Sequence, residues 1–429
     1  MIKSLEIKGL YYLYNYKLDN LDRDQVRIIT GPNGYGKTTL LNIIFNLLNC
    51  NLWFFNFLIF KELIVVFSDS CKIRLIKNTD SSDSSTDNDF SPSYNDVHVE
   101  FSLSDQQVES FDITKQYVFR LYRRLSMIHG LERNVNTDDI KGLLTEYYSY
   151  NNDTTLPSSS RNACLYLRGQ GCSFLRSERL LAPNSSIRIS RYRESKDVIK
   201  KVENDIKSLY FQQLSLYGRR SREIDKSFID RLTSDNKDTS NLLTKKEYLE
   251  EAAKLNGQII RLQNFGLAMD LKVSTNYKSE YRPVLTLYLK DVKEKINILG
   301  DFYKKLSLFD SFISKKTLSH KTMRLDPDLG ISFNDDIGNP VPLSGLSDGE
   351  KSLVVLYYNL IFNSQANSVI LIDEPEKSMH VEWVSNVLND YIEMSKILNC
   401  QIIFATHSPT FINGNWDLTS DLFEMNGNR

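Results

Sequence analysis

The sequence predicts an α/β fold that is split by a large, mainly helical insertion. Three observations support this prediction. A glycine-rich loop joins an apolar strand to a helix near the amino terminus, two apolar strands that end in polar residues lie near the carboxyl terminus, and the residues between them carry apolar side chains at helical spacing. We expect a first lobe with the loop (1–110), a helical or mixed segment that rejoins the core (111–190), an insertion of short, hairpin-like helices (191–320) and a second lobe (321–429).

Size and composition bound the class of protein. The chain has 429 residues, of which 41% are hydrophobic, enough for two or three domains with a sizeable core. A formal net charge of -1 predicts no overall attraction to nucleic acid or to membranes. The most apolar run, residues 52–60, is too short to span a bilayer, and the amino terminus lacks the apolar core of a signal peptide. We expect a soluble, cytoplasmic protein with no membrane partner.

The cysteines are scattered along the chain and form no close CxxC pair. This spacing predicts neither a disulfide framework nor a zinc site, so we expect reduced thiols at all five positions. The five are Cys50, Cys71, Cys164, Cys172 and Cys400.

The glycine-rich loop has the sequence ITGPNGYGKTTL, residues 29–40. Its glycines allow the backbone to curl so that successive N–H groups point at phosphate oxygens. Lys37 adds a positive charge at the β- and γ-phosphates, and the Thr38 hydroxyl is placed to bind Mg²⁺. A buried strand precedes the loop and a helix follows it, with the helix amino terminus facing the anion. The predicted nucleotide-binding residues are Asn33, Gly34, Gly36, Lys37, Thr38 and Thr39.

Two acidic residues end the predicted strand in SVILIDEPE, residues 368–376. Asp373 is expected to hold Mg²⁺ through water, and Glu374 is expected to act as the general base on the attacking water. The alternative is that both are ordinary solvated carboxylates at a strand end.

A second buried strand, in QIIFATHSP (401–409), ends at His407. A histidine at this place can donate a hydrogen bond to a γ-phosphate, although a structural role is the alternative. The following Ser-Pro pair is typical of a helix start.

The segment LSDGE, residues 346–350, opens a long apolar helix. Ser347, Gly349 and the free N–H groups of a helix start form a candidate anion site, although an ordinary helix cap has the same residues. The chain already has one phosphate loop. A second anion site is useful if it reaches the nucleotide of another copy, and this favours a homodimer.

Taken in order, these motifs resemble those of the ATP-binding-cassette (ABC) ATPases. LSDGE is similar to their signature motif, and ATHS is similar to their switch histidine. The GPNGYGKTTLLN start, the EPE sequence and the THSP ending resemble the non-transporter branch. That branch comprises SMC-like DNA-repair ATPases, the overcoming-lysogenization-defect (OLD) nucleases and anti-phage relatives of the PtuA or AriA type. The resemblance covers roughly residues 1–70 and 322–415.

The resemblance implies an ABC-type P-loop ATPase head that binds ATP and Mg²⁺, hydrolyses ATP and forms a homodimer or higher oligomer with composite sites. Asp348 departs from the family pattern, which has Gly or Ser there, and Met379-His380-Val381 replaces Leu-His-Pro. Gln170 is a candidate for the glutamine loop of the family. Arg176 and Arg179 follow a predicted strand, as in the anti-phage branch, and are expected near the active face or simply on the surface.

Three apolar stripes indicate helices between residues 195 and 315, and Thr244 with Glu247 forms a capping box at the start of one of them. Core packing explains the stripes, with partner docking as the alternative. Residues 161–226 are rich in Lys and Arg, which indicates either nucleic-acid binding or a solvated helical face. The stripes are Val202, Ile206, Leu209 and Leu216; Tyr248, Ala252, Leu255, Ile259 and Leu262; and Val292, Ile296, Leu299, Phe302, Leu306, Phe309 and Ile313.

The expected function is that of an ATPase subunit in a machine of several proteins. The OLD enzymes carry a nuclease domain after the ATPase, and the short segment after His407 leaves no room for one. Asp326 and Asp328 are expected to form a turn and not a metal site. We therefore expect a separately encoded effector, a nuclease or toxin, in anti-phage defence. The alternatives are an SMC-like DNA-binding ATPase and the nucleotide-binding subunit of a transporter.

Overall fold

The structure is a computed structural model that describes residues 1–77, 96–103, 107–129, 144, 160–177, 198–233, 242–316, 318, 320–377 and 379–427. The chain divides into two compact units. The first unit comprises Met1–Ser195 and Asn363–Arg429, and the second comprises Lys196–Phe362. Within the described residues, no helix has the length and apolar character needed to cross a membrane.

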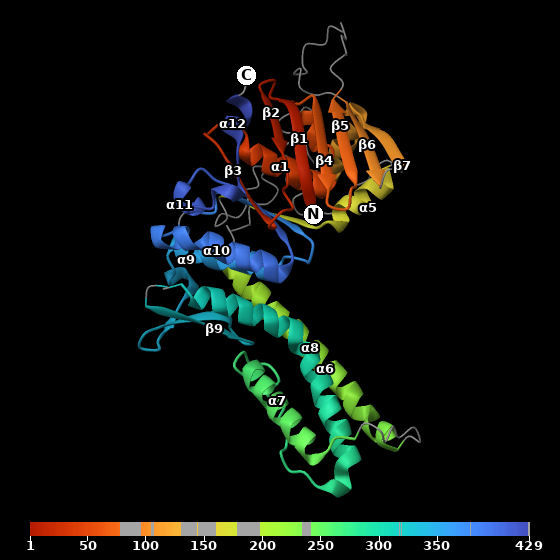
Figure 1. The fold of residues 1–429 in the computed structure, drawn as a ribbon, viewed down its shortest axis with the longest axis vertical. Helices are drawn as coiled ribbons and strands as arrows, with labels where there is room; N and C mark the ends of the chain where they lie inside the picture. Colours follow the sequence, from red (N-terminus) through yellow and green to blue (C-terminus); the bar gives the residue numbers. More distant parts are fainter. Residues whose placement is uncertain are drawn as a thin grey trace. The chain divides into compact units, whose positions relative to one another are not determined.

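The first unit contains a six-stranded antiparallel sheet with the strand order β2-β1-β4-β5-β6-β7 (Figure 1). Apolar residues alternate with polar ones along its strands, so that one face joins the core, as expected for a sheet covered on one side. The strands are β1 (Ile2–Leu10), β2 (Tyr14–Leu18), β4 (Glu62–Phe67), β5 (Lys72–Lys77), β6 (Val97–Leu103) and β7 (Gln107–Ile113).

The second sheet of this unit is fully parallel, in the order β14-β3-β13-β12-β8. Its three central strands, β3, β13 and β12, are buried at every position, which explains their mainly apolar sequences. This sheet confirms the predicted α/β class. The strands are β3 (Val26–Thr30), β8 (Cys172–Leu175), β12 (Val369–Asp373), β13 (Gln401–Ala405) and β14 (Thr419–Asp421).

Helix α1 (Lys37–Leu48) lies in the core that the two sheets share. Its buried leucines and isoleucines belong to one hydrophobic cluster with residues of β1, β4, β12 and β13. The fully buried Gln401 fixes the sheets to each other, because its amide accepts from the Ile2 N–H at 2.8 Å and donates to the Ile2 and Leu21 carbonyls. The other helices of the unit are α2 (Phe54–Phe57), α3 (Lys115–His129), α5 (Arg161–Gly169), α10 (Val381–Leu398), α11 (Pro409–Ile412) and α12 (Leu422–Gly427).

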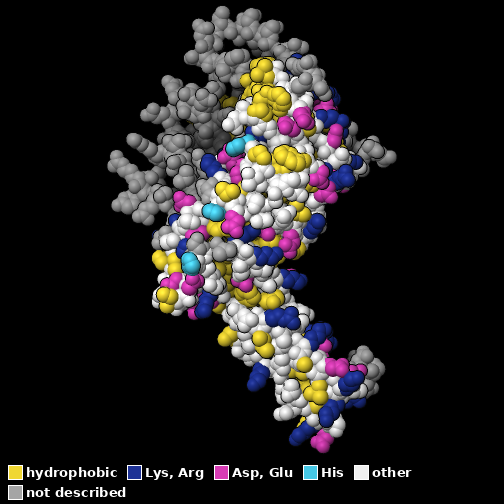
Figure 2. All heavy atoms as spheres, turned by 60° about the vertical axis from the view of Figure 1, so that its left-hand side comes forward, with side chains coloured by type: hydrophobic (Ala, Val, Ile, Leu, Met, Phe, Trp, Pro, Cys, Tyr) yellow, Lys and Arg dark blue, Asp and Glu magenta, His cyan; other side chains and the backbone are white. Residues whose placement is uncertain are grey.

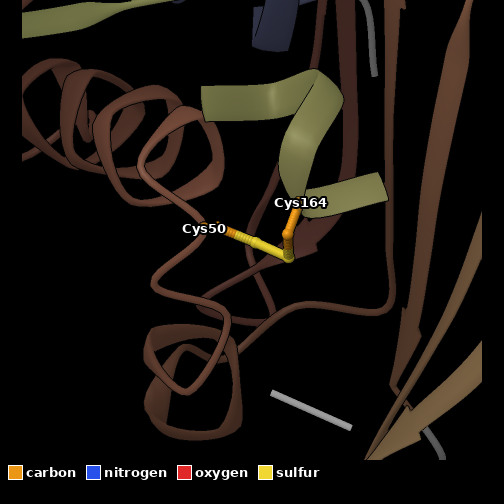
Figure 3. Close-up of a disulfide and its surroundings, with 2 residues drawn as sticks. All are labelled: Cys50 and Cys164. Atoms are coloured by element: carbon orange, nitrogen blue, oxygen red, sulfur yellow. A yellow bond between two sulfur atoms is a disulfide. The ribbon is translucent and has the colours of Figure 1, made fainter. Parts of the chain in front are cut away.

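One disulfide corrects the expectation of five reduced thiols. Cys50, just after α1, is bonded to Cys164 on α5, with the two Cα atoms 5.6 Å apart (Figure 3). The two residues are 114 positions apart, so no local spacing could reveal the pair. They meet because α5 packs against α1. Cys71, Cys172 and Cys400 are free, as expected.

In the second unit, helix α8 (Arg282–Ser314) packs against both α6 (Val198–Thr233) and α7 (Lys245–Gln263). The α7 and α8 stripes are buried throughout, which confirms core packing there, whereas Leu216 of the α6 stripe is 37% exposed. The predicted capping box of Thr244 and Glu247 is also confirmed. At 36 and 33 residues, α6 and α8 are longer than the short helices that the stripes indicated (Figure 1).

A small antiparallel sheet precedes the last helix of this unit. Strands β9 (Lys321–Asp326), β10 (Gly330–Asp335) and β11 (Pro340–Val341) lead into α9 (Asp348–Phe362). The Asp326 carboxylate accepts from the N–H groups of Asp328 and Leu329, which confirms the predicted turn.

Candidate functional site

The glycine-rich loop leaves β3 at Thr30 and enters α1 at Lys37, the strand–loop–helix arrangement that the motif requires. Gly34 and Gly36 have φ angles of 87° and 83°, a region that side chains rarely adopt. No side chain caps the start of α1, and its first turn has no acidic residue. Its first N–H groups lack partners within the helix and can bind an anion.

Lys37 folds over this loop. Its ammonium group donates to the carbonyl oxygens of Gly31 at 2.7 Å and Pro32 at 3.1 Å. Burial lowers the pKa of Lys37, while the charges of Asp373, Glu374 and Glu376 act to raise it. The positive charge therefore lies between the loop and a group of carboxylates.

Thr38 and Asp373 are in direct contact. The Thr38 hydroxyl donates to both carboxylate oxygens of Asp373, at 3.0 and 3.2 Å. The contact follows from topology, because parallel strands place their carboxyl ends at the same edge and β13 alone separates β3 from β12. Asp373 is only 6% exposed, and this burial raises its pKa, although the Thr38 hydrogen bond acts against the change.

The Thr38 and Asp373 oxygens fit a magnesium ion. Mg²⁺ prefers hard oxygen ligands and takes one or two from the protein, with the rest from water and phosphate. In the part of the chain that the structure describes, no group of three or more His, Cys, Asp or Glu residues could hold a metal ion.

Glu374 leaves the strand direction. Its φ is 45°, and its N–H donates to the Ala405 carbonyl at 2.9 Å. A non-glycine residue in this region is strained, and such strain is concentrated at functional sites. The half-buried carboxylate lies 3.8 Å from the Lys377 ammonium group. Glu374 is thus fixed at the sheet edge beside Asp373.

His407 follows β13 at the same edge and is exposed. The N–H of the preceding Thr406 donates to the Ile29 carbonyl of β3 at 3.1 Å, which ties this turn to the strand of the phosphate loop. The structure therefore brings the loop, Asp373, Glu374 and His407 to one edge of the parallel sheet.

Two residues of this edge were missed by the sequence analysis, Glu376 and Thr406. The Thr406 hydroxyl donates to Glu376 Oε1 at 2.6 Å and accepts from the Ser408 N–H at 2.9 Å. The only signal was that Glu376 is the second acid of the EPE sequence, two residues after Glu374.

Aromatic side chains around the phosphate loop were also missed. The Tyr11 hydroxyl lies 3.4 Å from Thr39 Oγ1, and both Tyr11 and Tyr12 are exposed in the β1–β2 turn. Tyr35, inside the loop, has its ring centroid 5.5 Å from that of Tyr14 and 5.9 Å from that of Phe423. These contacts support the loop from both sides.

The LSDGE segment lies in the second unit, at the start of α9. Glu350 forms a capping box with Ser347: it accepts from the Ser347 N–H at 2.7 Å, and its own N–H donates to Ser347 Oγ at 3.3 Å. The Lys321 ammonium group donates to both Glu350 oxygens, at 2.9 and 3.0 Å. Ser347 is exposed and Gly349 is half-buried, so both remain accessible to a ligand.

The glutamine-loop interpretation of Gln170 is wrong. Gln170 precedes β8, so it lies at the amino edge of the parallel sheet, opposite the edge that carries Asp373. Its side chain accepts from the Met1 ammonium group at 3.0 Å. Arg176 follows β8 at the carboxyl edge and is exposed, with its guanidinium 5.3 Å from the centre of the Phe174 ring. Arg179 lies outside the described residues.

The basic segment is described only in part, because residues 178–197 lie outside the described residues. On α6, Arg220 pairs with Glu223 at 3.0 Å, and Arg222 donates to the Gly218 carbonyl. Basic and acidic side chains are interspersed over the helices of the second unit (Figure 2). This part of the segment fits a solvated helical face.

Two Smc head domains are among the solved structures that are similar to this chain. None of the curated proteins matches the chain. Among solved structures, the Smc head domain of Pyrococcus furiosus, with an extended coiled coil and bound to the C-terminal domain of ScpA, matches at 15% identity with a TM-score of 0.38, covering 96% of this chain and 90% of that one. A second Smc head, bound to the C-terminal winged-helix domain of ScpA, matches at 14% identity with a TM-score of 0.36, covering 96% and 91%.

A protein-family model covers most of the chain. It matches residues 28–413, which include the phosphate loop, the helical insertion and the three motifs near the carboxyl terminus. The chain therefore belongs to the ATPase family described as "AAA domain, putative AbiEii toxin, Type IV TA system".

Proposed function

We propose that this protein binds ATP together with Mg²⁺ and hydrolyses it to ADP and phosphate. The contact between Thr38 and Asp373 carries the proposal, because it joins the phosphate loop to the strand-end carboxylate at the place where a metal-bound phosphate must lie. Membership in an AAA-domain family supports nucleotide binding.

The residues of the site then have separate tasks. The loop N–H groups and Lys37 hold the phosphates, and Thr38 and Asp373 hold Mg²⁺, which neutralises negative charge on the phosphate oxygens. Glu374 accepts a proton from the attacking water. The water oxygen bonds to the γ-phosphorus while the bond between that phosphorus and the bridging oxygen of ADP breaks. His407 donates a hydrogen bond to the γ-phosphate. The exposed rings of Tyr11 and Tyr12, beside Thr39, offer a stacking surface for the base.

The ATPase acts as a homodimer in this proposal. Ser347 and Gly349 are accessible at the start of α9, and a second anion site in a chain that already has a phosphate loop is best explained by a nucleotide held in another copy. The proposed composite site therefore joins the loop of one copy to Ser347 and Gly349 of its partner.

The output of hydrolysis belongs to a separate effector, a nuclease or toxin, in anti-phage defence, as in the PtuA and AriA type of system. The family description, which names a toxin–antitoxin context, supports this direction. A DNA-binding SMC-like ATPase is the second candidate, for which the basic residues of α6 would form the contact surface. Mg²⁺- or Mn²⁺-dependent cleavage of DNA or RNA by the pure protein, lost in variants of this chain, would contradict the need for an effector.

Two substitutions test the ATPase assignment. Lys37→Ala is expected to abolish ATP binding, because the loop loses its only side-chain positive charge. Glu374→Gln is expected to keep binding but to lower kcat by roughly 10²–10⁴-fold, the scale of a positioned base. The measurements are ATP titration and Mg²⁺-dependent phosphate release.

Matched controls come from an exposed pair on α7. Lys246→Ala and Glu250→Gln change the same residue types at side chains that are 85% and 68% exposed, and should leave both readouts unchanged. Equal ATP affinity in wild type and Lys37→Ala would reject the loop assignment. Full turnover by Glu374→Gln would remove it as the base.

A further inference from the structure

Three strand-end segments of the parallel sheet are connected through one residue, Thr406. The Thr406 hydroxyl donates to Glu376 Oε1 at 2.6 Å, and Thr406 Oγ1 accepts from the Ser408 N–H at 2.9 Å. The Thr406 N–H donates to Ile29 in β3 at 3.1 Å. Thr406 therefore joins the segment after β12, the turn after β13 and the strand that leads into the phosphate loop.

The two residues that flank His407 in the sequence are both held by hydrogen bonds. His407 is exposed, and it lies between Thr406, which is fully buried, and Ser408, which caps α11 by accepting from the Phe411 N–H. The backbone on both sides of the imidazole is therefore held by hydrogen bonds. The direction of the side chain depends on how firmly Thr406 is held, and its hydroxyl donates to Glu376.

A glutamate at position 376 lowers the stability of the fold, which argues that its role is more than packing. Its Oε2 is buried and has no hydrogen-bond partner among the described residues. Leaving a buried polar atom unsatisfied is destabilising, and a carboxylate more so. It also adds a negative charge close to Asp373 and Glu374, where two acids already repel each other. An apolar residue would avoid both costs.

We propose that Glu376 is a positioning residue, which holds the Thr406–Ser408 turn so that His407 is fixed relative to the Glu374 segment. The proposal rests on the proposed ATPase function. Glu376 and Glu374 belong to the same segment, which follows β12. The Glu376–Thr406 hydrogen bond joins that segment to the turn that carries His407, in addition to the backbone hydrogen bond from the Glu374 N–H to the Ala405 carbonyl.

The first experiment tests the link itself without any activity. Hydrogen–deuterium exchange of the segment around residues 404–413 is measured in nucleotide-free protein. Glu376→Ala and Thr406→Val are expected to raise the exchange rate of this segment about fivefold, the scale of one lost hydrogen bond. Thr406→Ser keeps the hydroxyl, Glu376→Gln keeps an acceptor, and the exposed Glu382→Ala on α10 is the surface control. All three should exchange like wild type, and unchanged exchange in Glu376→Ala would reject the link.

The second experiment tests whether the link acts through His407. Glu376→Ala and Thr406→Val are expected to lower kcat by roughly 10- to 100-fold, the cost of a misplaced group, with little change in KM. Glu376→Gln should restore most of the rate, because its amide oxygen can accept from Thr406. In a His407→Ala background, Glu376→Ala should cause no further loss. An additional loss of the same size there would show that Glu376 acts independently of His407, and would overturn the proposal.

The two experiments separate the two hypotheses. If wild type releases no phosphate from ATP, the ATPase proposal fails, while the exchange measurement still decides whether Glu376 holds the turn. If wild type is active and the exchange of Glu376→Ala is unchanged, the ATPase proposal stands and the positioning role fails.

Discussion

The starts of α1 and α9 look alike in sequence but differ in what they leave open. Both helices begin after a short stretch with Gly or Ser, and both were predicted to bind phosphate. At α1, Gly36 provides no cap and the first turn has no acid. At α9, Ser347 and Glu350 cap each other, and Asp348 adds a second acid to the first turn.

The difference has an electrostatic consequence. The start of α1 has the partial positive charge of a helix amino terminus and a lysine beside it, so an anion is attracted. At α9 the carboxylate of Glu350, only 2% exposed, already interacts with the partial positive charge of the helix start, and the Lys321 ammonium group pairs with this carboxylate. The second start can still contact a phosphate through the accessible Ser347 side chain and Gly349. The start of α9 can therefore complete a phosphate site that another segment forms, but it is poorly suited to bind phosphate alone.

We expect the start of α1 to bind ATP and the start of α9 to be needed only for hydrolysis. Ser347→Arg should then give the largest effect. The bulky cation blocks the α9 start, so hydrolysis should fall by roughly 10²–10³-fold, the scale for losing a preorganised donor, while ATP binding at the loop is retained. Mixing this variant with Lys37→Ala should restore part of the phosphate release, because one site of a mixed dimer has both halves intact. No recovery under conditions where subunits exchange would contradict a site shared between copies. Circular dichroism checks that each variant is folded.

A smaller effect is expected when α1 is made to resemble α9. Thr39 occupies the third position of α1, as Glu350 does in α9, and it lies in the half-buried first turn. Thr39→Glu should weaken ATP binding by roughly 100-fold, because a like charge beside the phosphates costs several kcal/mol. Thr39→Gln has the same size without the charge and should weaken binding far less. Similar affinities for the two variants, measured by calorimetric titration, would show that charge does not distinguish the two helix starts.

Local patterns predicted much of the fold and of the site. The apolar runs of β3, β12 and β13 identified buried parallel strands, and a motif of four residues was enough for the capping box of Thr244 and Glu247. Because parallel strands share an edge, the strand-end positions of Asp373 and His407 followed from the same reasoning. The same capping motif at 347–350 was interpreted mainly as an anion site, because the charge of Lys321 comes from a distant strand.

What the sequence did not reveal depends on contacts between distant segments. The Cys50–Cys164 bond arises where α5 packs on α1, and Thr406 meets Glu376 across two strand ends. Gln170 was misplaced for a related reason. Its role depends on the edge of the sheet at which it lies, and that edge is known only when the direction of β8 is known.

The smallest effect concerns the pH dependence of the α9 cap. Burial acts to raise the pKa of Glu350, but the hydrogen bonds from Ser347 and Lys321 outweigh it, and the pKa lies below the ordinary value of 4.5. A carboxyl whose pKa is lower in the folded state stabilises the fold above its unfolded pKa, and this stabilisation is lost as the pH falls through the folded value. We therefore expect Glu350 to stabilise the second unit at neutral pH by about 2 kcal/mol, the scale of hydrogen bonds to a charged group.

The experiment compares the wild type with a Lys321→Met, Glu350→Gln double variant, which keeps a capping side chain but removes both charges. Urea unfolding is followed by far-UV circular dichroism for the helices, with tryptophan fluorescence as an internal control. All three tryptophans, Trp53, Trp383 and Trp416, lie in the first unit, so their transition should not depend on the substitutions. The stability advantage of the wild type should be constant near neutral pH and shrink below about pH 4.5. An advantage that persists in acid would mean that the pair stabilises α9 by packing and not by charge.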